Sequence, residues 1–213
     1  MKQISLHLCA AIALAAATTV SMTPAARAAD IISEWATVKA PPPPAEKPVT
    51  VDTKNTALLM LDFLKQNCGK RPRCVATVPA VAKLLGEARA AKIPVIYSYF
   101  ANHTAADILD KRLAPVAGEG SVTSFADKFI NTDLDKMLKD KGIKNVIVVG
   151  TSANGAILCT GTDAALRGYN VIVPVDGISS ADTYSEQFST WQLANGPTFS
   201  KRVTITKIGM VKF

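Results

Sequence analysis

The chain has 213 residues, of which 48% are hydrophobic and 19% are charged. This composition excludes a disordered chain and a coiled coil, and the length suits one α/β domain with a buried core. Lys and Arg (24) outnumber Asp and Glu (17), which gives a net charge of +7, but only 6% of residues are aromatic and few basic residues cluster. We therefore expect no nucleic-acid partner.

Residues 1–28 have the pattern of a secretory signal peptide. Lys2 precedes a short apolar run at residues 8–17, and Ala-Arg-Ala at residues 26–28 offers a cleavage site. The apolar run is too short to span a bilayer comfortably, so we expect cleavage after Ala28 and no stable membrane anchor. The mature chain is then a periplasmic or secreted protein.

The mature chain divides into a lead-in and one domain. Residues 29–50 contain a run of prolines without periodicity, which is typical of a stiff polyproline segment. The domain follows at residues 51–213, where apolar runs alternate with amphipathic segments. We expect strands at residues 55–63, 94–100, 145–150, 170–176 and 203–206. We expect helices at residues 78–92, 132–141, 155–167 and 182–195, and an irregular segment covering a cleft at residues 101–123.

Strands that are apolar throughout and alternate with helices predict a mainly parallel sheet covered on both faces, a three-layer α/β/α, Rossmann-like sandwich. Ligands of such sheets bind outside the carboxyl ends of the strands. Asp62, the turn at Gly150 and Asp176 lie at such ends. Asp62 is either a cleft carboxylate or a buried strand-end residue satisfied by backbone N–H groups, and we interpret Asp176 as a brace for the following loop.

The expected export of the chain decides how its cysteines are interpreted. Cys9 leaves with the signal peptide, and Cys68 and Cys74 bracket a short polar loop. In an oxidising compartment this spacing predicts a disulfide, whereas a redox pair or a metal clip needs closer spacing or further ligands. Cys159 is then the odd thiol and the one remaining candidate nucleophile.

The segment VIVVGTSANGAILCTGTDAALRGYNVIVPVDG at residues 146–177 resembles the isochorismatase-like cysteine hydrolase family. Asp62 and FINTDLDKML at residues 129–138 fit the same family, and the resemblance covers roughly residues 55–180. It implies a three-layer α/β/α fold and an Asp-Lys-Cys triad. It also implies hydrolysis of amides such as nicotinamide, or of the vinyl ether in isochorismate.

Carried over residue by residue, the triad is incomplete. Asp62 matches the family aspartate, which acts as general base towards the cysteine thiol. The cysteine position, six residues after Gly150, is Ala156, and the Thr and Asp-Ala that follow it keep the register. The lysine position is Thr123. Two of the three triad positions therefore differ from the family pattern.

Two residues are candidate substitutes for the cysteine and lysine of the triad. Cys159 lies three residues beyond Ala156 on the expected helix, past most of the free N–H groups that stabilise a thiolate. It is either an inert helix residue or a relocated nucleophile paired with Lys128. Lys128 is itself either that partner or a solvated charge before Phe129.

The turn before the expected helix supplies the remaining candidates. Relatives place a non-proline cis peptide here, which the resemblance implies between Thr151 and Ser152. Ser152 and Asn154 either donate to a bound anion or carbonyl, or only cap the helix. Together with Thr123 and Ala156, they are the expected substrate-binding residues.

Metal and cofactor chemistry is not expected. Nicotinamidase-like relatives hold a metal with an aspartate and several histidines, but His103 is the one histidine left after signal removal. We interpret His103 as a loop or cleft-edge residue. The resemblance also allows a homo-oligomer.

Two functional hypotheses remain. The first is a periplasmic family hydrolase of a small amide or enol-ether-like metabolite, with Asp62 as a general acid of raised pKa. The second is a catalytically inactive family member that binds a small molecule. The substitutions at Ala156 and Thr123 favour the second, and the retained Asp62 favours the first.

Overall fold

The computed structural model describes residues 29–213, so the expected signal peptide lies outside the described residues. The chain divides into two units between Pro41 and Pro42. In the first unit, the short helix α1 (Ile31–Glu34) is capped by the side chain of Asp30 and is followed by a 3-10 turn at residues 35–37. The second unit holds the sheets and the other helices.

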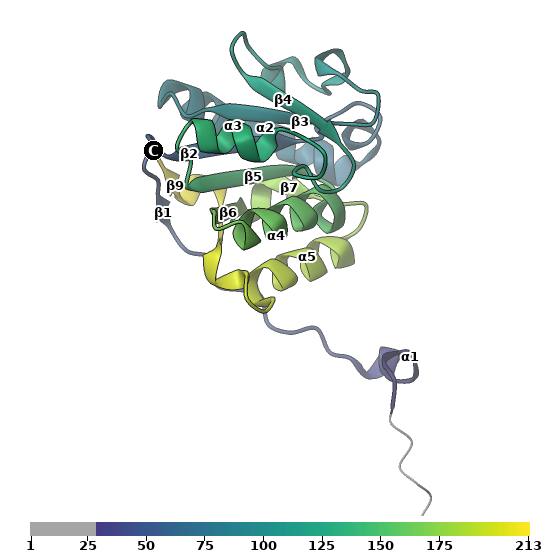
Figure 1. Cartoon of the computed structure of the whole chain (residues 1–213). Coiled ribbons are helices and arrows are strands. Elements are labelled where there is room, and N and C mark those ends of the chain that lie inside the picture. The colour runs from purple at the N-terminus through teal and green to yellow at the C-terminus, as the bar shows by residue number, and fades with distance from the viewer. Residues whose placement is uncertain (1–28) are drawn as a thin grey trace, which may run out of the picture. The chain divides into compact units, whose positions relative to one another are not determined.

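The main sheet has the strand order β4-β3-β2-β5-β6-β8, and each neighbouring pair is parallel (Figure 1). Its strands are β2 (Thr56–Leu61), β3 (Val95–Phe100), β4 (Gly120–Ser124), β5 (Asn145–Thr151), β6 (Asn170–Pro174) and β8 (Val203–Thr206). The short strand β7 (Ile178–Ser179) pairs with the end of β5. β1 (Val49–Thr50) and β9 (Val211–Lys212) form a separate parallel pair. β2 is buried at every position, as expected of a central parallel strand.

Helices cover both faces of this sheet. They are α2 (Pro72–Ala90), α3 (Leu134–Asp140), α4 (Leu158–Leu166) and α5 (Thr183–Asn195). Leu58 and Met60 of β2 pack with α2 in one core cluster. Leu59 and Leu61, which alternate with them, pack with α3, α4 and α5 in a second cluster. The result is the expected three-layer α/β/α sandwich. Within residues 29–213, no helix has the length and apolar character needed to cross a membrane.

Three elements differ from the sequence prediction. The segment expected to be irregular ends in the edge strand β4, whose mixed burial gives no apolar run to recognise. Helix α2 begins at Pro72 rather than Val78, because proline is well suited to the first helical turn. β1 lies before Val51, within the segment expected to be a lead-in. In addition, a π-helical turn at residues 153–157 precedes α4.

Candidate active site

A buried ion pair lies at the carboxyl edge of β2. Asp62 follows the strand with φ of 56° and is 4% exposed. Lys128 Nζ lies 2.8 Å from Asp62 Oδ2, and the lysine is completely buried. Ser98 of β3, which pairs with Leu61, donates its hydroxyl to Asp62 Oδ1 at 2.7 Å. The interpretation of Lys128 as a solvated charge is therefore wrong. Its side chain is buried because it forms an ion pair with Asp62, which lies far from it in the sequence.

Hydrogen bonds hold the loop after β4 in a position from which Lys128 reaches the carboxylate of Asp62. The backbone N–H of Lys128 donates to Thr160 Oγ1 on α4 at 3.1 Å. Its ammonium group also donates to the backbone carbonyl of Phe125. Thr160 lies one helical turn after Ala156, so the two residues share a face of the helical segment. The hydrogen bond to Thr160 therefore connects the ion pair to the face of the helical segment that also carries Ala156.

Asp62 and the start of the helix are neighbours at the same edge of the sheet. Leu61 and Gly150 are paired across β2 and β5, so Asp62 and Thr151 are the next residues on adjacent strands. Ala156, in the π-helical turn, is 4% exposed and packs in the same core cluster as Leu61. Its methyl group provides no nucleophile. The carboxyl edge of the sheet therefore brings a carboxylate and an ammonium group together with the apolar side chain of Ala156.

The environment of Asp62 shifts the pKa of its carboxyl group. Burial raises the pKa of the Asp62 carboxyl, while the charge of Lys128, the hydroxyl of Ser98 and the nearby His103 act in the opposite direction. Burial is the largest influence, and the pKa lies above its ordinary value of 3.8. A carboxyl group with a raised pKa is suited to donate a proton.

The cis peptide that the resemblance implies is present between Thr151 and Ser152. Thr151 Oγ1 donates to the carbonyl of Ser179 at 3.2 Å and accepts from Arg71 Nη1 at 3.2 Å. The turn is therefore held by β7 on one side and by the start of α2 on the other.

Ser152 and Asn154, the expected donors of this turn, are occupied by hydrogen bonds to other side chains. Ser152 Oγ donates to Asn154 Oδ1 at 2.7 Å, and Ser180 Oγ donates to the same oxygen at 2.8 Å. Asn154 Nδ2 donates to Ser185 Oγ near the start of α5 at 3.3 Å. These bonds tie the turn to α5.

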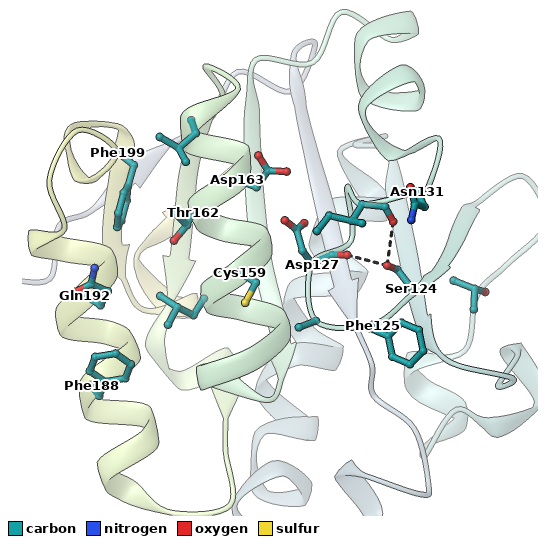
Figure 2. Close-up of a pocket in the computed structure, with 15 residues that line it drawn as sticks. Ser124, Phe125, Asp127, Asn131, Cys159, Thr162, Asp163, Phe188, Gln192 and Phe199 are labelled. Atoms are coloured by element: carbon teal, nitrogen blue, oxygen red, sulfur yellow. Dashed lines mark hydrogen bonds between the residues drawn. The ribbon is translucent and has the colours of Figure 1, made fainter.

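Cys159 and Thr123 make no hydrogen bond to either member of the ion pair within the described residues. Both line a cavity of about 1000 Å³ formed by the loop after β4, by α4 and by α5, together with Phe125, Phe188 and Phe199 (Figure 2). Among residues 29–213, no hydrogen bond connects Cys159 to Asp62 or Lys128. Burial and the charge of Asp127 raise the pKa of the Cys159 thiol more than the charge of Lys128 lowers it, so the thiol is protonated at neutral pH. The structure thus brings Lys128, but not Cys159, to Asp62.

The expected disulfide is formed. Cys68 and Cys74 are bonded with their Cα atoms 5.2 Å apart, and both are buried. The closed loop contains Arg71, which sequence reasoning missed together with Ser98. The signal for Ser98 was a hydroxyl in the otherwise apolar run of β3. For Arg71 it was a basic residue in a constrained loop soon after the strand that carries Asp62.

His103 and Asp176 have simpler surroundings. His103 Nδ1 lies 3.5 Å from a carboxylate oxygen of Asp107 in the loop after β3. Asp176 Oδ1 accepts the backbone N–H of Ile208 at 2.8 Å, so it braces the chain after β8. Over residues 29–213, no group of three or more His, Cys, Asp or Glu side chains is placed to hold a metal ion.

Comparison with known proteins identifies the family. Residues 56–206 match the family model described as "Isochorismatase domain". The chain belongs to the isochorismatase family. It is 29% identical over 149 residues to a secreted isochorismatase effector of Verticillium dahliae, covering 63% of this chain and 78% of the relative. It is 26% identical over 135 residues to an uncharacterized isochorismatase family protein of Bacillus subtilis, covering 55% of this chain and 74% of that protein.

Solved structures share the isochorismatase-like fold. A cysteine hydrolase from Pseudomonas syringae superposes with a TM-score of 0.66 at 23% identity, covering 75% of this chain and 91% of that one. N-carbamoylsarcosine amidase from Thermoplasma acidophilum superposes with a TM-score of 0.62 at 20% identity, covering 72% of this chain and 96% of that one. These likenesses confirm the expected fold class.

Within this isochorismatase-family fold, the two altered triad positions differ in their consequences. Thr123, the lysine position implied by the resemblance, is exposed on β4, and Lys128 reaches Asp62 from five residues further along the chain. An ammonium group therefore remains beside the carboxylate. At position 156 the side chain is a methyl group, which cannot act as a nucleophile. The structure therefore pairs an ammonium group with the carboxylate of Asp62, and residue 156 carries no nucleophilic group.

Proposed function

We propose that this isochorismatase-family hydrolase cleaves a small enol-ether-like substrate by proton transfer from Asp62, without a covalent enzyme intermediate. The observation that carries the proposal is the buried Asp62–Lys128 pair beside Ala156. A carboxyl group with a raised pKa supplies the acid, and the alanine leaves no side chain to attack the substrate.

The reaction balances with water as the second reactant. Protonated Asp62 gives its proton to the terminal carbon of the enol ether, which turns the carbon bearing the ether oxygen into an oxocarbenium ion. Water adds to that carbon and loses a proton, and the resulting hemiketal separates into an alcohol and a ketone. Asp62 then recovers a proton from solvent. The ammonium group of Lys128, 2.8 Å away, stabilises the carboxylate that forms during the transfer.

Hydrolysis of an amide is supported less well by this site. The family route to amides requires a thiolate near Asp62. Cys159 is the one free thiol within the described residues, its pKa is raised, and it lines the cavity between α4, α5 and the loop after β4 without a hydrogen bond to Asp62. An enol ether needs only a proton donor and water.

The setting of the reaction is also part of the proposal. The signal-peptide pattern of residues 1–28, the Cys68–Cys74 disulfide and the likeness to a secreted relative support a place outside the cytoplasm. We therefore place the mature hydrolase in the periplasm or the secreted fraction.

One observation favours a second candidate function. Ala156 at the nucleophile position is also what a non-catalytic small-molecule binding protein would contain. Such a protein would keep the Asp62–Lys128 pair for structure and ligand binding, and it would not turn over any substrate.

A substrate panel distinguishes the candidates. Simple enol ethers, carboxamides and esters are incubated with the wild type, Asp62→Asn and Cys159→Ala. We expect hydrolysis of enol ethers, its loss in Asp62→Asn and unchanged turnover in Cys159→Ala. Amide turnover that disappears in Cys159→Ala would contradict the proposal. A panel without turnover, in which one compound raises the melting temperature, would support the binding protein.

A further inference from the structure

A pocket with basic walls lies at the amino edge of the main sheet, opposite the edge that carries Asp62. Its volume is about 330 Å³, and it forms where the connections after α3 and α4 and the turn before β8 meet the starts of β5 and β6. Its charged lining residues are Lys139, Lys144, Arg167 and Arg202, and none of the lining residues is acidic. A cavity of this size suits a small ligand.

The pocket is far from the candidate active site. Asn145, the first residue of β5, pairs with Thr56, and Asp62 lies six residues beyond Thr56. At about 3.3 Å per residue, the two edges of the sheet are about 20 Å apart. Because Lys144 directly precedes Asn145, a ligand in this pocket lies too far away to contact the carboxylate of Asp62. The inference therefore does not depend on the proposed function.

Two of the four cations already have carboxylate partners. Lys139 Nζ lies 2.6 Å from Asp135 Oδ2, and Arg167 Nε lies 2.9 Å from Asp163 Oδ2. Lys139 also lies in the last turn of α3 and Arg167 directly after α4, where a positive charge stabilises a helix. These two cations therefore have a structural explanation and do not by themselves indicate a ligand.

The other two cations have no such partner. Within residues 29–213, no carboxylate oxygen lies within 4.0 Å of Lys144 or Arg202. Over the same residues, the side chain of Lys144 makes no hydrogen bond. Arg202 Nη1 donates to the carbonyl of Gly168 at 2.9 Å and to Asn170 Oδ1 at 3.4 Å, and both acceptors are neutral. The pocket therefore keeps two positive charges that no carboxylate neutralises.

The hydrogen bonds of Arg202 leave one edge of its guanidinium group free. Of the five N–H donors, the three on Nε and Nη2 have no partner within the described part of the chain. This edge can bind two oxygens of a carboxylate or phosphate, as the Nε and Nη2 atoms of Arg73 do with Glu186. Asn170 is itself held, because its Nδ2 donates to Asn145 Oδ1 at 2.9 Å. The guanidinium group is thus oriented before a ligand binds.

We propose that this pocket binds a phosphomonoester group, with Arg202 contacting two of its oxygens and Lys144 supplying the second positive charge. A phosphomonoester is mainly a dianion above a pKa of about 6, so its charge matches the two uncompensated cations. Arginine recognises phosphate through its planar geometry, and lysine binds it as a point charge. A soluble phosphomonoester and the headgroup of phosphatidic acid present the same chemistry.

The binding test compares glycerol 3-phosphate with glycerol, titrated calorimetrically into the mature protein. Ionic strength is held constant with sodium chloride, because salt screens exposed charges. We expect the wild type to bind glycerol 3-phosphate and not glycerol. Arg202→Gln should weaken binding at least about 10-fold, and Arg202→Lys less, since lysine keeps the charge but loses the two-point contact. Lys144→Gln should weaken binding about 3-fold.

Two control variants locate the site. Lys141→Gln removes an exposed charge from the same connection between α3 and β5, and Arg71→Gln removes an arginine from the opposite edge of the sheet. Both should bind glycerol 3-phosphate like the wild type. Equal losses in Lys141→Gln and Arg202→Gln, a loss in Arg71→Gln alone, or no binding by the wild type would overturn the proposal. If Arg202→Gln fails to fold, Lys144→Gln and Arg202→Lys supply the same comparison.

Vesicles identify the source of the phosphate group. Phosphatidylcholine vesicles with and without phosphatidic acid are sedimented in the presence of the protein. Binding of glycerol 3-phosphate without sedimentation would assign the pocket to a soluble phosphomonoester. Sedimentation that requires phosphatidic acid and is lost in Arg202→Gln would assign it to a lipid headgroup.

Discussion

Removing one partner of the Asp62–Lys128 pair is the most informative test of the site's structure. Lys128→Met keeps the length of the side chain and removes its ammonium group. The Asp62 side chain, 6% exposed, then keeps Ser98 as its remaining hydrogen-bond donor among the side chains that contact it. Leaving one charge of a buried pair uncompensated typically costs about 3–5 kcal/mol. We expect Lys128→Met to lose about that much free energy of unfolding at pH 7.

The double variant separates charge from packing. Asp62→Asn alone leaves the completely buried ammonium group without its counter-ion, which costs a similar amount. Asp62→Asn combined with Lys128→Met contains neither charge, so its loss should be well below the sum of the two single losses, with a coupling of about 3 kcal/mol. Urea unfolding of the four proteins measures this directly. Additive losses would refute the view that the two side chains form one buried unit.

The free energy of unfolding of Lys128→Met depends on pH, and the sign of this dependence follows from the raised pKa of Asp62. Lys128 lowers the pKa of Asp62, so its removal moves a pKa that already lies above 3.8 further upward. A carboxyl group whose folded pKa is raised loses stability as pH rises through that pKa. The deficit of Lys128→Met relative to the wild type should therefore shrink as pH falls from 7 towards 4. A constant deficit would show that lost packing, rather than charge, causes the destabilisation.

Two further predictions concern stability. The Cys68–Cys74 bond closes a loop with a sequence separation of 6, so Cys68→Ala with Cys74→Ala should lower the free energy of unfolding by about 2 kcal/mol. Reductant should produce the same loss in the wild type and none in the variant, and a wild type insensitive to reductant would contradict this. Gly150 has φ of 143°, and an added Cβ would lie 2.0 Å from the Leu61 carbonyl oxygen. Gly150→Ala should therefore cost at least about 4 kcal/mol in urea unfolding, whereas Gly168→Ala, which meets no atom within 4 Å, should cost less.

The sequence was informative where local pattern determines structure. The apolar run before Asp62 predicted a buried strand, and the order of strands and helices predicted a parallel sheet, at whose carboxyl edge the candidate site lies. The residues that follow Gly150 placed Ala156 at the helix start. Each of these inferences depends on periodicity or spacing within a short segment.

The features that escaped prediction depend on contacts between distant segments. Lys128 looks like a surface lysine until the chain folds, because Asp62 and Thr160 are far from it in sequence. β4 is polar at several positions and becomes a strand by pairing with β3 at the sheet edge. Arg71 contacts Thr151 because α2 begins at Pro72, earlier than its apolar stripe indicates.

The central claim is that Asp62 donates the proton. The pH dependence of kcat/KM for 2-methoxyacrylate tests it most directly, measured from pH 4 to 8 with the wild type and Asp62→Asn, after subtraction of the uncatalysed rate. The account predicts a rate constant that falls as pH rises through the raised pKa of Asp62, and no enzymatic rate in Asp62→Asn. A rate that increases with pH, or one that persists in Asp62→Asn, would contradict it.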